Sequence, residues 1–304
     1  MHSGEDHLFG LMATPLTHSD GLTTRAAKRA LTQSFQEADL PFAEMEALEI
    51  VLHVTGLDRA ALILRGSEPL TPAMCEQIQN AMTRRLAREP LDHILGWREF
   101  FGRRFTVTKD VLSPRADTET LIRLALSALS NIQNPHLLDL GTGSGAIGLT
   151  LLAERADATL IATDLSEAAL NIARQNAKQL QVEDRVTFTQ GAWWSAIAAD
   201  TQFDAILSNP PYIDAKAMTA LEIEVAEYDP ALALAGGEDG LRDYRAILEQ
   251  AHGHLRPQGW LGLEIGFDQA NTVSTLVKMA GFIDINVTQD LGWNDRVVSA
   301  RKSS

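Results

Sequence analysis

The sequence predicts an α/β protein whose main domain is a doubly wound, mostly parallel sheet, preceded by a small all-helical domain. Three features support this prediction. Apolar residues first repeat at helical spacing, strand-like and helix-like segments then alternate from about residue 136, and a glycine-rich turn joins the first of those strands to a helix. The length of 304 residues also favours two domains over one.

Composition places the chain among globular proteins with a sizeable core, because 45% of its residues are hydrophobic and 22% are charged. The formal net charge of -14 argues against wrapping a nucleic-acid backbone, which rewards clustered Lys and Arg through counterion release. Cys75 is the only cysteine, so an internal disulfide and a cysteine-based metal site are excluded. A reducing, cytoplasmic location is therefore expected.

Neither a targeting peptide nor a membrane span is expected. Residues 1–20 contain acidic residues and three histidines but no long apolar core and no Arg-rich face, so they are expected to form a loose N-terminal tail. No stretch of the chain reaches the roughly 18 consecutive apolar residues that a membrane-spanning helix requires. We therefore expect no membrane partner.

Residues 21–90 are expected to form the helical domain. Apolar residues recur on one helix face from Ala27 to Phe35, and Thr71 followed by proline has the N-cap and first-turn residues of a further helix. The domain is expected to close at Pro90. This pattern is equally compatible with a structural accessory and with a substrate-docking module.

Two further segments complete the predicted organisation. Residues 97–107 (WREFFGRRFTV) place aromatic and β-branched residues around a Gly-Arg-Arg turn, which predicts a short hairpin inside an interdomain linker over 91–112. Residues 113–304 are expected to form the α/β domain. Its strands are predicted at 136–140, 159–164, 186–189, 203–208 and 260–265, and its helices near 145–155, 166–180, 239–255 and 268–279.

The glycine-rich turn, LLDLGTGSGAIGLTLL over 137–152, passes from a buried strand into a helix. Small residues at such a turn let the backbone approach a ligand at the helix N-terminus, which predicts a nucleotide-like cofactor site. The small residues concerned are Gly141, Thr142, Gly143, Ser144 and Gly145.

Two ligand classes compete for this turn. The run from Gly143 to Gly148 matches the G-x-G-x-x-G fingerprint of dinucleotide-dependent dehydrogenases, with Asp164 at the end of the next strand as the ribose-binding acid. Asp139 instead gives the D-x-G-x-G-x-G form typical of S-adenosylmethionine sites, whose ligand has no pyrophosphate to neutralise. The turn favours the second class, and a dehydrogenase or a turn without a ligand stays open at this point.

The most specific motif is Asn209-Pro210-Pro211-Tyr212, which follows the apolar strand at 203–208 at the edge where open α/β sheets bind ligands. A planar amide or ring-attached amine nitrogen is a poor nucleophile because its lone pair is delocalised, so catalysis requires acceptors that hold its hydrogens. The Asn209 side chain and the Pro210 carbonyl can accept them, and Tyr212 can stack on the planar group. Such positioning lowers the barrier without a charged base.

These motifs together favour methyl transfer to an amide or amine nitrogen. Asn-Pro and Pro-Pro are common turn formers, but the glycine-rich loop, the acid and the tetrapeptide follow three separate strands.

No metal site is expected, because His252 and His254 point to different helix faces and the histidines are expected to be solvated. The acidic stretch 221–229 is expected to be a solvated face or lid, with contact to a basic partner as the alternative.

From about Thr23 to Arg301 the chain resembles the family of N5-glutamine methyltransferases that modify peptide chain release factors. The glycine loop and the Asn-Pro-Pro-Tyr motif are shared with other amino-methyltransferases. Three runs are more specific to the family: REPLDHILGWREFFGRRF at 88–105, VLSPRADTETL at 111–121 and YDPALALAGGEDGLRDYRAIL at 228–248. They look like that family's interdomain hairpin, pre-catalytic segment and post-catalytic loop.

The resemblance implies a seven-stranded, Rossmann-like S-adenosylmethionine-dependent methyltransferase domain and a helical domain that helps to dock a release factor. The glycine loop would lie under the methionine end of the cofactor, Asp164 would hold the ribose hydroxyls, and Trp193 would line the adenine pocket. A core aromatic is an equal alternative for Trp193. The Asn-Pro-Pro-Tyr loop would receive the glutamine of a Gly-Gly-Gln loop in a class I release factor, with Asn209 touching both cofactor and acceptor.

Rival functions stay open on the sequence. A methyltransferase for adenine or guanine amino groups in nucleic acid would hold a planar nitrogen in the same way, although the net charge opposes it. A scaffold that binds the cofactor without catalysis would not need Asn209 and Pro210. The chain departs from the family's usual residues at Ser113, Ala116 and Ala192, so altered cofactor affinity is expected.

Overall fold

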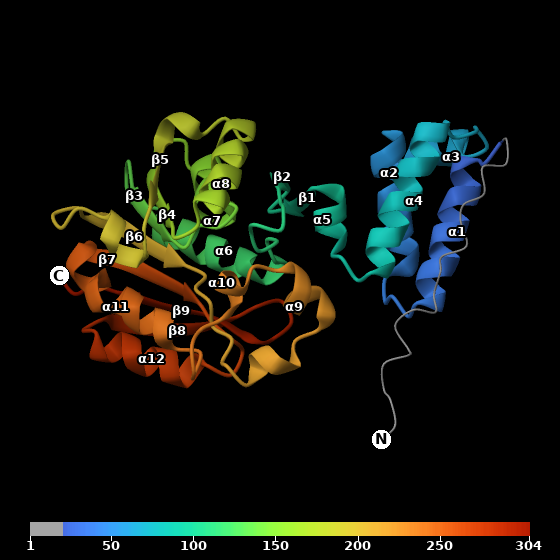
Figure 1. Ribbon diagram of the computed structural model, residues 1–304. Coiled ribbons are helices and arrows are strands. Elements are labelled where there is room, and N and C mark those ends of the chain that lie inside the picture. The colour runs from blue at the N-terminus through green and yellow to red at the C-terminus, as the bar shows by residue number, and fades with distance from the viewer. Residues whose placement is uncertain (1–20) are drawn as a thin grey trace, which may run out of the picture. The chain divides into compact units, whose positions relative to one another are not determined.

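The computed structural model describes residues 21–304, and the expected N-terminal tail over 1–20 lies outside the described residues. The chain divides into two compact units, one ending at Leu95 and the other spanning Gly96–Ser304 (Figure 1). Each unit has its own buried apolar residues. The predicted hairpin at 97–107 falls in the second unit.

The first unit is all helical, as the sequence predicts. Thr23 accepts a hydrogen bond from the Ala26 amide at the start of the first helix, and Thr71 caps the fourth helix in the same way ahead of Pro72. Leu31 and Phe35 of the first helix are fully buried in its core. The helices are α1 (Thr24–Glu37), α2 (Ala43–Thr55), α3 (Arg59–Arg65), α4 (Pro72–Leu86) and α5 (Leu91–Leu95).

An ion pair is buried between α2 and α4. The Arg85 guanidinium donates from Nε to Glu46 Oε2 at 2.7 Å and from Nη2 to Glu46 Oε1 at 3.1 Å. The two side chains are only 3% and 8% exposed. Bidentate geometry of this kind is the arrangement in which a buried pair offsets its desolvation.

The second unit begins with a two-stranded hairpin of β1 (Trp97–Phe100) and β2 (Arg103–Thr106). The sequence predicts this hairpin, but the prediction of a Gly-Arg-Arg turn is wrong. Phe101 and Gly102 make the turn with positive φ of 50° and 70°, and the two arginines lie on β2 instead. The Arg104 guanidinium stacks over the Trp97 ring at 4.0 Å. This contact crosses the hairpin, because Trp97 lies on β1 and Arg104 on the paired strand β2.

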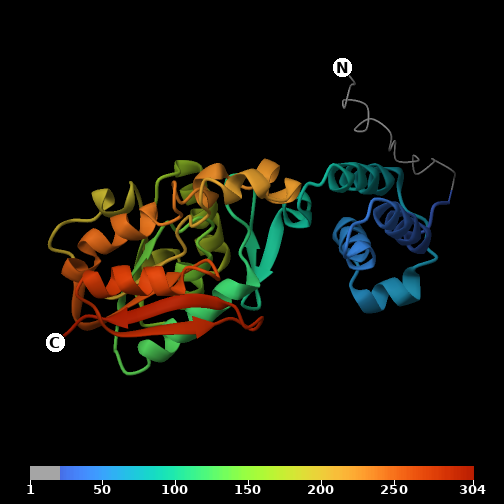
Figure 2. The ribbon, with the colours of Figure 1, turned by 90° about the horizontal axis from the view of Figure 1, so that it is seen from below.

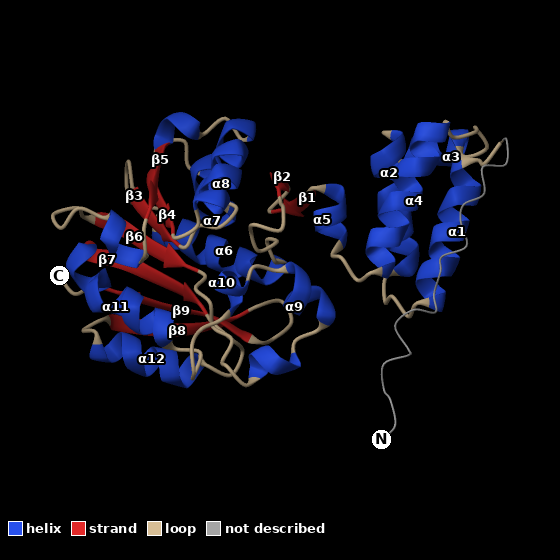
Figure 3. Cartoon of the chain, in the orientation of Figure 1, coloured by secondary structure: helices blue, strands red, loops and turns tan. Residues whose placement is uncertain are grey.

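A seven-stranded sheet forms the centre of the second unit, in the order β5-β4-β3-β6-β7-β9-β8 (Figure 3). The first five strands of this order are parallel, and β9 runs antiparallel to both of its neighbours. The strands are β3 (His136–Leu140), β4 (Thr159–Asp164), β5 (Val186–Gln190), β6 (Phe203–Ser208), β7 (Leu255–Glu264), β8 (Ile283–Gln289) and β9 (Asp295–Arg301). The doubly wound prediction is confirmed.

Helices cover both faces of this sheet (Figure 2). Alternation along the strands explains this, because Leu137 of β3 joins the core under one set of helices and Leu138 joins the core on the other face. One face packs on α6 (Glu119–Ala128), α7 (Ala146–Glu154) and α8 (Glu167–Gln179), and the other on α11 (Arg242–His254) and α12 (Ala270–Met279). Shorter helices are η1 (Ala116–Thr118), η2 (Glu183–Arg185), η3 (Trp193–Ala196), η4 (Ala217–Ala220), α9 (Ile223–Tyr228) and α10 (Ala231–Leu234).

The topology fixes where a ligand site forms. From β3 the chain winds outward through β4 to β5, and it then returns to the other side of β3 with β6. Such a reversal leaves a crevice outside the carboxyl ends of the strands.

Within residues 21–304, no helix combines the length and apolar character needed to cross a bilayer.

We expect Glu46→Ala to destabilise the helical unit by about 3–5 kcal/mol, because the substitution leaves the buried Arg85 charge without its carboxylate. Amide hydrogen exchange in α2 and α4 of the full chain measures the corresponding loss of protection. Glu44→Ala is the matched control, because the Glu44 carboxylate is largely exposed in its 2.8 Å pair with Lys28. Equal protection in the two variants would contradict a stabilising role for the buried pair.

Candidate active site

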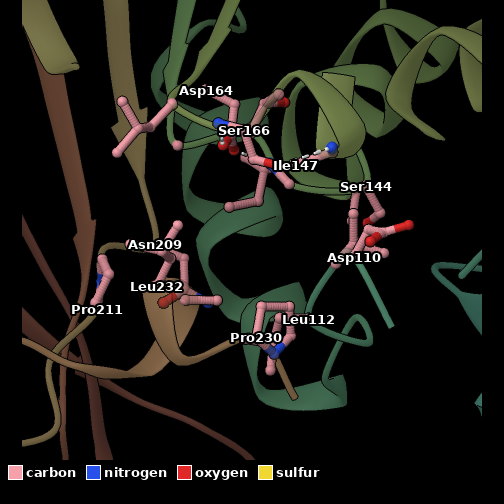
Figure 4. A pocket seen from close by; sticks show the side chains of 18 of the residues that line it. Asp110, Leu112, Ser144, Ile147, Asp164, Ser166, Asn209, Pro211, Pro230 and Leu232 are labelled. Atoms are coloured by element: carbon pink, nitrogen blue, oxygen red, sulfur yellow. Dashed lines mark hydrogen bonds between the residues drawn. The ribbon is translucent and has the colours of Figure 1, made fainter. Parts of the chain in front are cut away.

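A pocket opens at the carboxyl edge of β3, β4 and β6. Figure 4 shows Asp164 and Ser166 on one side of the hollow, with Asn209 and Pro211 on another. Separate parts of the chain supply its walls. They are the glycine loop at 141–144, residues 164–166 after β4, residues 191–193 after β5, Asn209 and Pro211 after β6, and the segments 110–115 and 230–233.

The glycine loop has a backbone that residues with a Cβ atom rarely adopt. Gly141, Gly143 and Gly145 have φ of 72°, 55° and 83°. A Cβ atom at Gly145 would also lie 2.5 Å from Leu149 Cδ1 in the following helix. The loop therefore requires glycine for conformation and for close packing, and it leads directly into the N-terminus of α7, whose free N–H groups favour polar ligand atoms.

Asp139 hydrogen bonds to this loop and to the helix that follows it. It is fully buried near the end of β3, and its Oδ2 accepts from Thr142 Oγ1 at 2.7 Å and from the Gly148 amide at 3.0 Å. Its Oδ1 has no hydrogen-bond partner among residues 21–304. Burial raises the pKa of Asp139 to about 6, because desolvation outweighs these two hydrogen bonds.

Asp164 ends β4 beside the loop and lines the pocket. Its Oδ2 accepts from the Gly143 amide at 2.9 Å and its Oδ1 from the Ser166 amide at 2.9 Å. Each oxygen keeps a further lone pair, so the carboxylate can still accept from a ligand hydroxyl. Burial raises its pKa, and the backbone N–H donors oppose that shift.

Asn176 of α8 connects the glycine loop to the hairpin. Its Nδ2 donates to the Ser144 carbonyl at 2.8 Å and to the Thr106 carbonyl at 3.1 Å, and its Oδ1 accepts from the Thr106 amide at 2.7 Å. The side chain is fully buried and every one of its polar atoms is used. A single amide thus holds strand β2 and the glycine loop together, a role that no sequence pattern indicated.

The Asn-Pro-Pro-Tyr loop follows β6 directly. Asn209 and Pro211 line the pocket, whereas Pro210 is buried and does not line it. Tyr212 does not line it either; its carbonyl accepts from Gln269 Nε2 at 3.1 Å, and its ring reaches to 3.4 Å of where a Cβ atom at Gly266 would lie. Burial, and then the charge of Glu264, raise the pKa of Tyr212.

The two adjacent tryptophans after β5 have different environments. Trp193, with φ of 47°, lines the pocket beside Gly141. Trp194 is buried, donates from Nε1 to the Ala246 carbonyl at 3.0 Å, and stacks on the His254 ring at 4.8 Å. The core aromatic is therefore Trp194.

The expectation that the histidines are solvated is wrong for two of them. His254 is buried under Trp194, with its Nδ1 2.8 Å from the Thr201 carbonyl, and His93 is buried in the helical unit. Helix faces explain this, because the inward side of α11 carries His254 while His252 on the other side is half-buried. Among the described residues, no group of three or more His, Cys, Asp or Glu side chains is arranged to hold a metal ion.

Known proteins share this organisation over nearly the whole chain. Residues 26–96 match the family described as PrmC N-terminal domain, and residues 111–228 match the Methyltransferase small domain. A release factor glutamine methyltransferase of Cereibacter sphaeroides is 45% identical over 275 residues, which cover 90% of this chain and 97% of that protein. One of Bradyrhizobium diazoefficiens is 41% identical over 286 residues, which cover 93% and 96% of the two chains.

The chain belongs to the release factor glutamine methyltransferase family. It is an S-adenosylmethionine-dependent methyltransferase, which excludes the dehydrogenase alternative for the glycine loop. A solved structure agrees in fold: the hMettl16 catalytic domain in complex with MAT2A 3'UTR hairpin 6 gives a TM-score of 0.55 at 15% identity, over 78% of this chain and 84% of that chain.

The pocket of this family member also contains residues that the chemical argument from sequence did not select. Leu112, Pro114 and Thr118 come from the segment before and within η1, and Pro230 and Leu232 come from the segment around α10. Their only sequence signal was membership of the two family-specific runs at 111–121 and 228–248. Two departures from the family pattern, Ser113 and Ala192, line the pocket as well.

We expect Asp139→Asn to gain stability relative to the unsubstituted protein as pH rises from 5 to 7.5. The pKa of Asp139 is raised to about 6 from 3.8, so its stabilising contribution is complete at low pH and is lost as pH rises through 6. Asparagine can keep both hydrogen bonds on its one oxygen and carries no charge at either pH. Urea unfolding midpoints at the two pH values measure the difference.

Asp157→Asn is the control for this experiment. Its hydrogen bond with Arg155 lowers the pKa of Asp157 to about 2, so its contribution is already complete above 3.8 and stays constant between pH 5 and 7.5. A stability difference for Asp139→Asn that is as insensitive to pH as that of Asp157→Asn would contradict the raised pKa.

Proposed function

We propose that this protein transfers the methyl group of S-adenosylmethionine to the side-chain amide nitrogen, N5, of the glutamine in the Gly-Gly-Gln loop of class I peptide chain release factors. The observation that carries the proposal is the meeting of Asn209 and Pro211 with the glycine loop in one pocket. The curated relatives named as release factor glutamine methyltransferases support the choice of acceptor.

The cofactor half of the pocket suits S-adenosylmethionine. We propose that the glycine loop, from Gly141 to Gly145, underlies the methionine end, and that the open lone pairs of Asp164 accept from the ribose hydroxyls. Trp193 would pack beside the adenine, where its ring already lines the pocket. The bound cofactor supplies an electrophilic methyl group on a positively charged sulfur.

The acceptor half holds the amide without a charged base. Asn209 Oδ1 would accept one hydrogen of the glutamine amide and the Pro210 carbonyl the other, which directs the nitrogen lone pair at the methyl group. The two prolines restrict the loop, so little freedom is lost when the acceptor binds. Tyr212 is the proposed stacking partner of the planar amide, because it ends the loop that would receive the acceptor.

The helical unit is the proposed docking module. A glutamine side chain offers few atoms for recognition, so contacts remote from the reacting nitrogen must supply selectivity and orientation. The match of residues 26–96 to the PrmC N-terminal domain supports this assignment. We propose the organisation expected from the sequence, with docking by 21–90, a linker over 91–112, a catalytic domain over 113–304 and action in the cytoplasm, where release factors work.

Incubation of the protein with radiolabelled S-adenosylmethionine tests the acceptor directly. We expect label in intact release factor, at a much higher kcat/KM than in a short Gly-Gly-Gln peptide, and none in DNA or RNA. Digestion and mass spectrometry locate the methyl group on the glutamine side chain. Label in nucleic acid instead would overturn the proposed acceptor, and equal kcat/KM on factor and peptide would overturn the docking role.

We expect Asn209→Ala to abolish detectable methyl transfer while leaving the Kd for S-adenosylmethionine within about tenfold. Loss of one acceptor misaligns the substrate nitrogen, whereas the glycine loop and Asp164 remain in place. Calorimetric titration and the labelling assay measure the two effects separately. Turnover close to that of the unsubstituted protein would remove Asn209 from the catalytic role.

A further inference from the structure

A buried carboxyl group outside the pocket lies beside the Asn-Pro-Pro-Tyr loop. Glu264 is the last residue of β7, and the residue before it, Leu263, is the Cα partner of Ser208 at the end of β6. Paired strands lie about 4.8 Å apart, so Glu264 stands next to Asn209 at the same edge of the sheet. No sequence motif indicated a role for this residue.

The carboxyl group of Glu264 is incompletely satisfied. Its side chain is almost fully buried, at 1% exposed, and Thr118 hydrogen bonds to the carboxylate. Its Oε2 is buried and has no hydrogen-bond partner in the part of the chain that the structure describes. An unpaired buried carboxylate oxygen is costly, and positions that retain such a group are enriched at functional sites.

Both arginines whose charges act on Glu264 already pair with other carboxylates, and Arg115 lies 3.7 Å from Asp229. Arg296 is already paired with Asp290 at 3.0 Å and lies 3.6 Å from Asp117. The Tyr244 hydroxyl donates to the backbone carbonyl of Glu264 at 2.9 Å rather than to its carboxylate. The polar and charged groups that face Glu264 are Arg115, Asp117 and Thr118 around η1, Tyr212 after β6, Tyr244 of α11 and Arg296 of β9.

The proposed reaction develops positive charge on the acceptor nitrogen. The sulfur–methyl bond breaks with its electron pair left on sulfur, the amide nitrogen forms the new bond with its lone pair, and one nitrogen-bound proton then leaves to water. Positive charge thereby moves from the cofactor toward the acceptor nitrogen. A fixed anion on the acceptor side stabilises that displaced charge, and a buried one does so most effectively because water does not screen it.

We propose that Glu264 is a positioning residue that holds a fixed negative charge behind the Asn-Pro-Pro-Tyr loop and thereby stabilises the positive charge that develops on the acceptor nitrogen. The inference rests on the proposed function, because it takes a neutral amide as the acceptor. Glu264 acts through space and through the loop beside it.

The protonation of Glu264 offers a readout that a purely structural role would not give. Burial raises the pKa of Glu264 to about 7, and the hydrogen bond from Thr118 and the charges of Arg296 and Arg115 oppose that rise. Only the ionised form carries the stabilising charge. Turnover at saturating cofactor and acceptor should therefore increase with pH through about 7.

The test compares Glu264→Gln, which keeps the shape and removes the charge, with the unsubstituted full-length protein on intact release factor. We expect kcat at pH 8 to fall at least about tenfold, the rise of kcat between pH 6 and 8 to disappear, and the Kd for S-adenosylmethionine to stay the same. Asp117→Asn is the matched control, because it removes a half-exposed charge from the same cluster and should keep the pH dependence.

Three results would overturn the proposal. The first is a Glu264→Gln protein with the kcat and pH profile of the unsubstituted enzyme. The second is a Glu264→Asp protein, which keeps the charge, with the same flat profile as Glu264→Gln. The third needs no variant and covers the case in which neither variant folds: an unsubstituted enzyme whose kcat does not change between pH 6 and 8. Absence of any methylation of release factor by the unsubstituted protein would count against the proposed function instead.

Discussion

The parallel pairing of β3, β6 and β7 determines where the functional residues of the catalytic unit lie. Leu140 pairs with Ser208, and Ser208 pairs with Leu263, so three strands reach the same edge in register. The next residue of each strand is Gly141, Asn209 or Glu264. The backbone hydrogen bonds of the sheet thus bring the cofactor loop, the acceptor loop and a buried carboxyl group together before any side chain of the pocket contributes.

Two acidic residues at this edge are both buried, and each lies beside a different loop. Asp139 and Glu264 are both buried, and each has one carboxylate oxygen without a hydrogen-bond partner among the described residues. Desolvation raises the pKa of both, to about 6 and about 7. Asp139 uses its other oxygen to brace the glycine loop, whereas Glu264 faces the loop after β6. Desolvation of the two carboxyl groups is therefore unfavourable at this sheet edge, and each group interacts with a different loop.

Much of this could be predicted from the sequence, because the deciding patterns are local. Strands β3 and β6 are mostly apolar and almost wholly buried, and Thr23 and Thr71 are capping residues that bond to amides only three positions along the chain. Strands β8 and β9 were not predicted, although Ile283, Ile285 and Val287 alternate with polar residues along β8 and β9 contains the buried pair Val297 and Val298. The structure leaves β8 mostly exposed, so its alternation does not mark a buried face. The burial of His254 and Glu264 depends on partners distant in sequence, and composition cannot distinguish Trp193 from Trp194.

The link through Asn176 sets a limit on how the hairpin can vary in length. Thr106 meets Asn176 with both its amide and its carbonyl, and the same side chain holds the Ser144 carbonyl in the glycine loop. A residue inserted or deleted between Phe101 and Thr106 would bring a different backbone unit opposite Asn176, with its side chain turned to the other face of the strand. Such a change would break the hydrogen bonds that tie the hairpin to the glycine loop, so the site itself fixes the number of residues between Phe101 and Thr106.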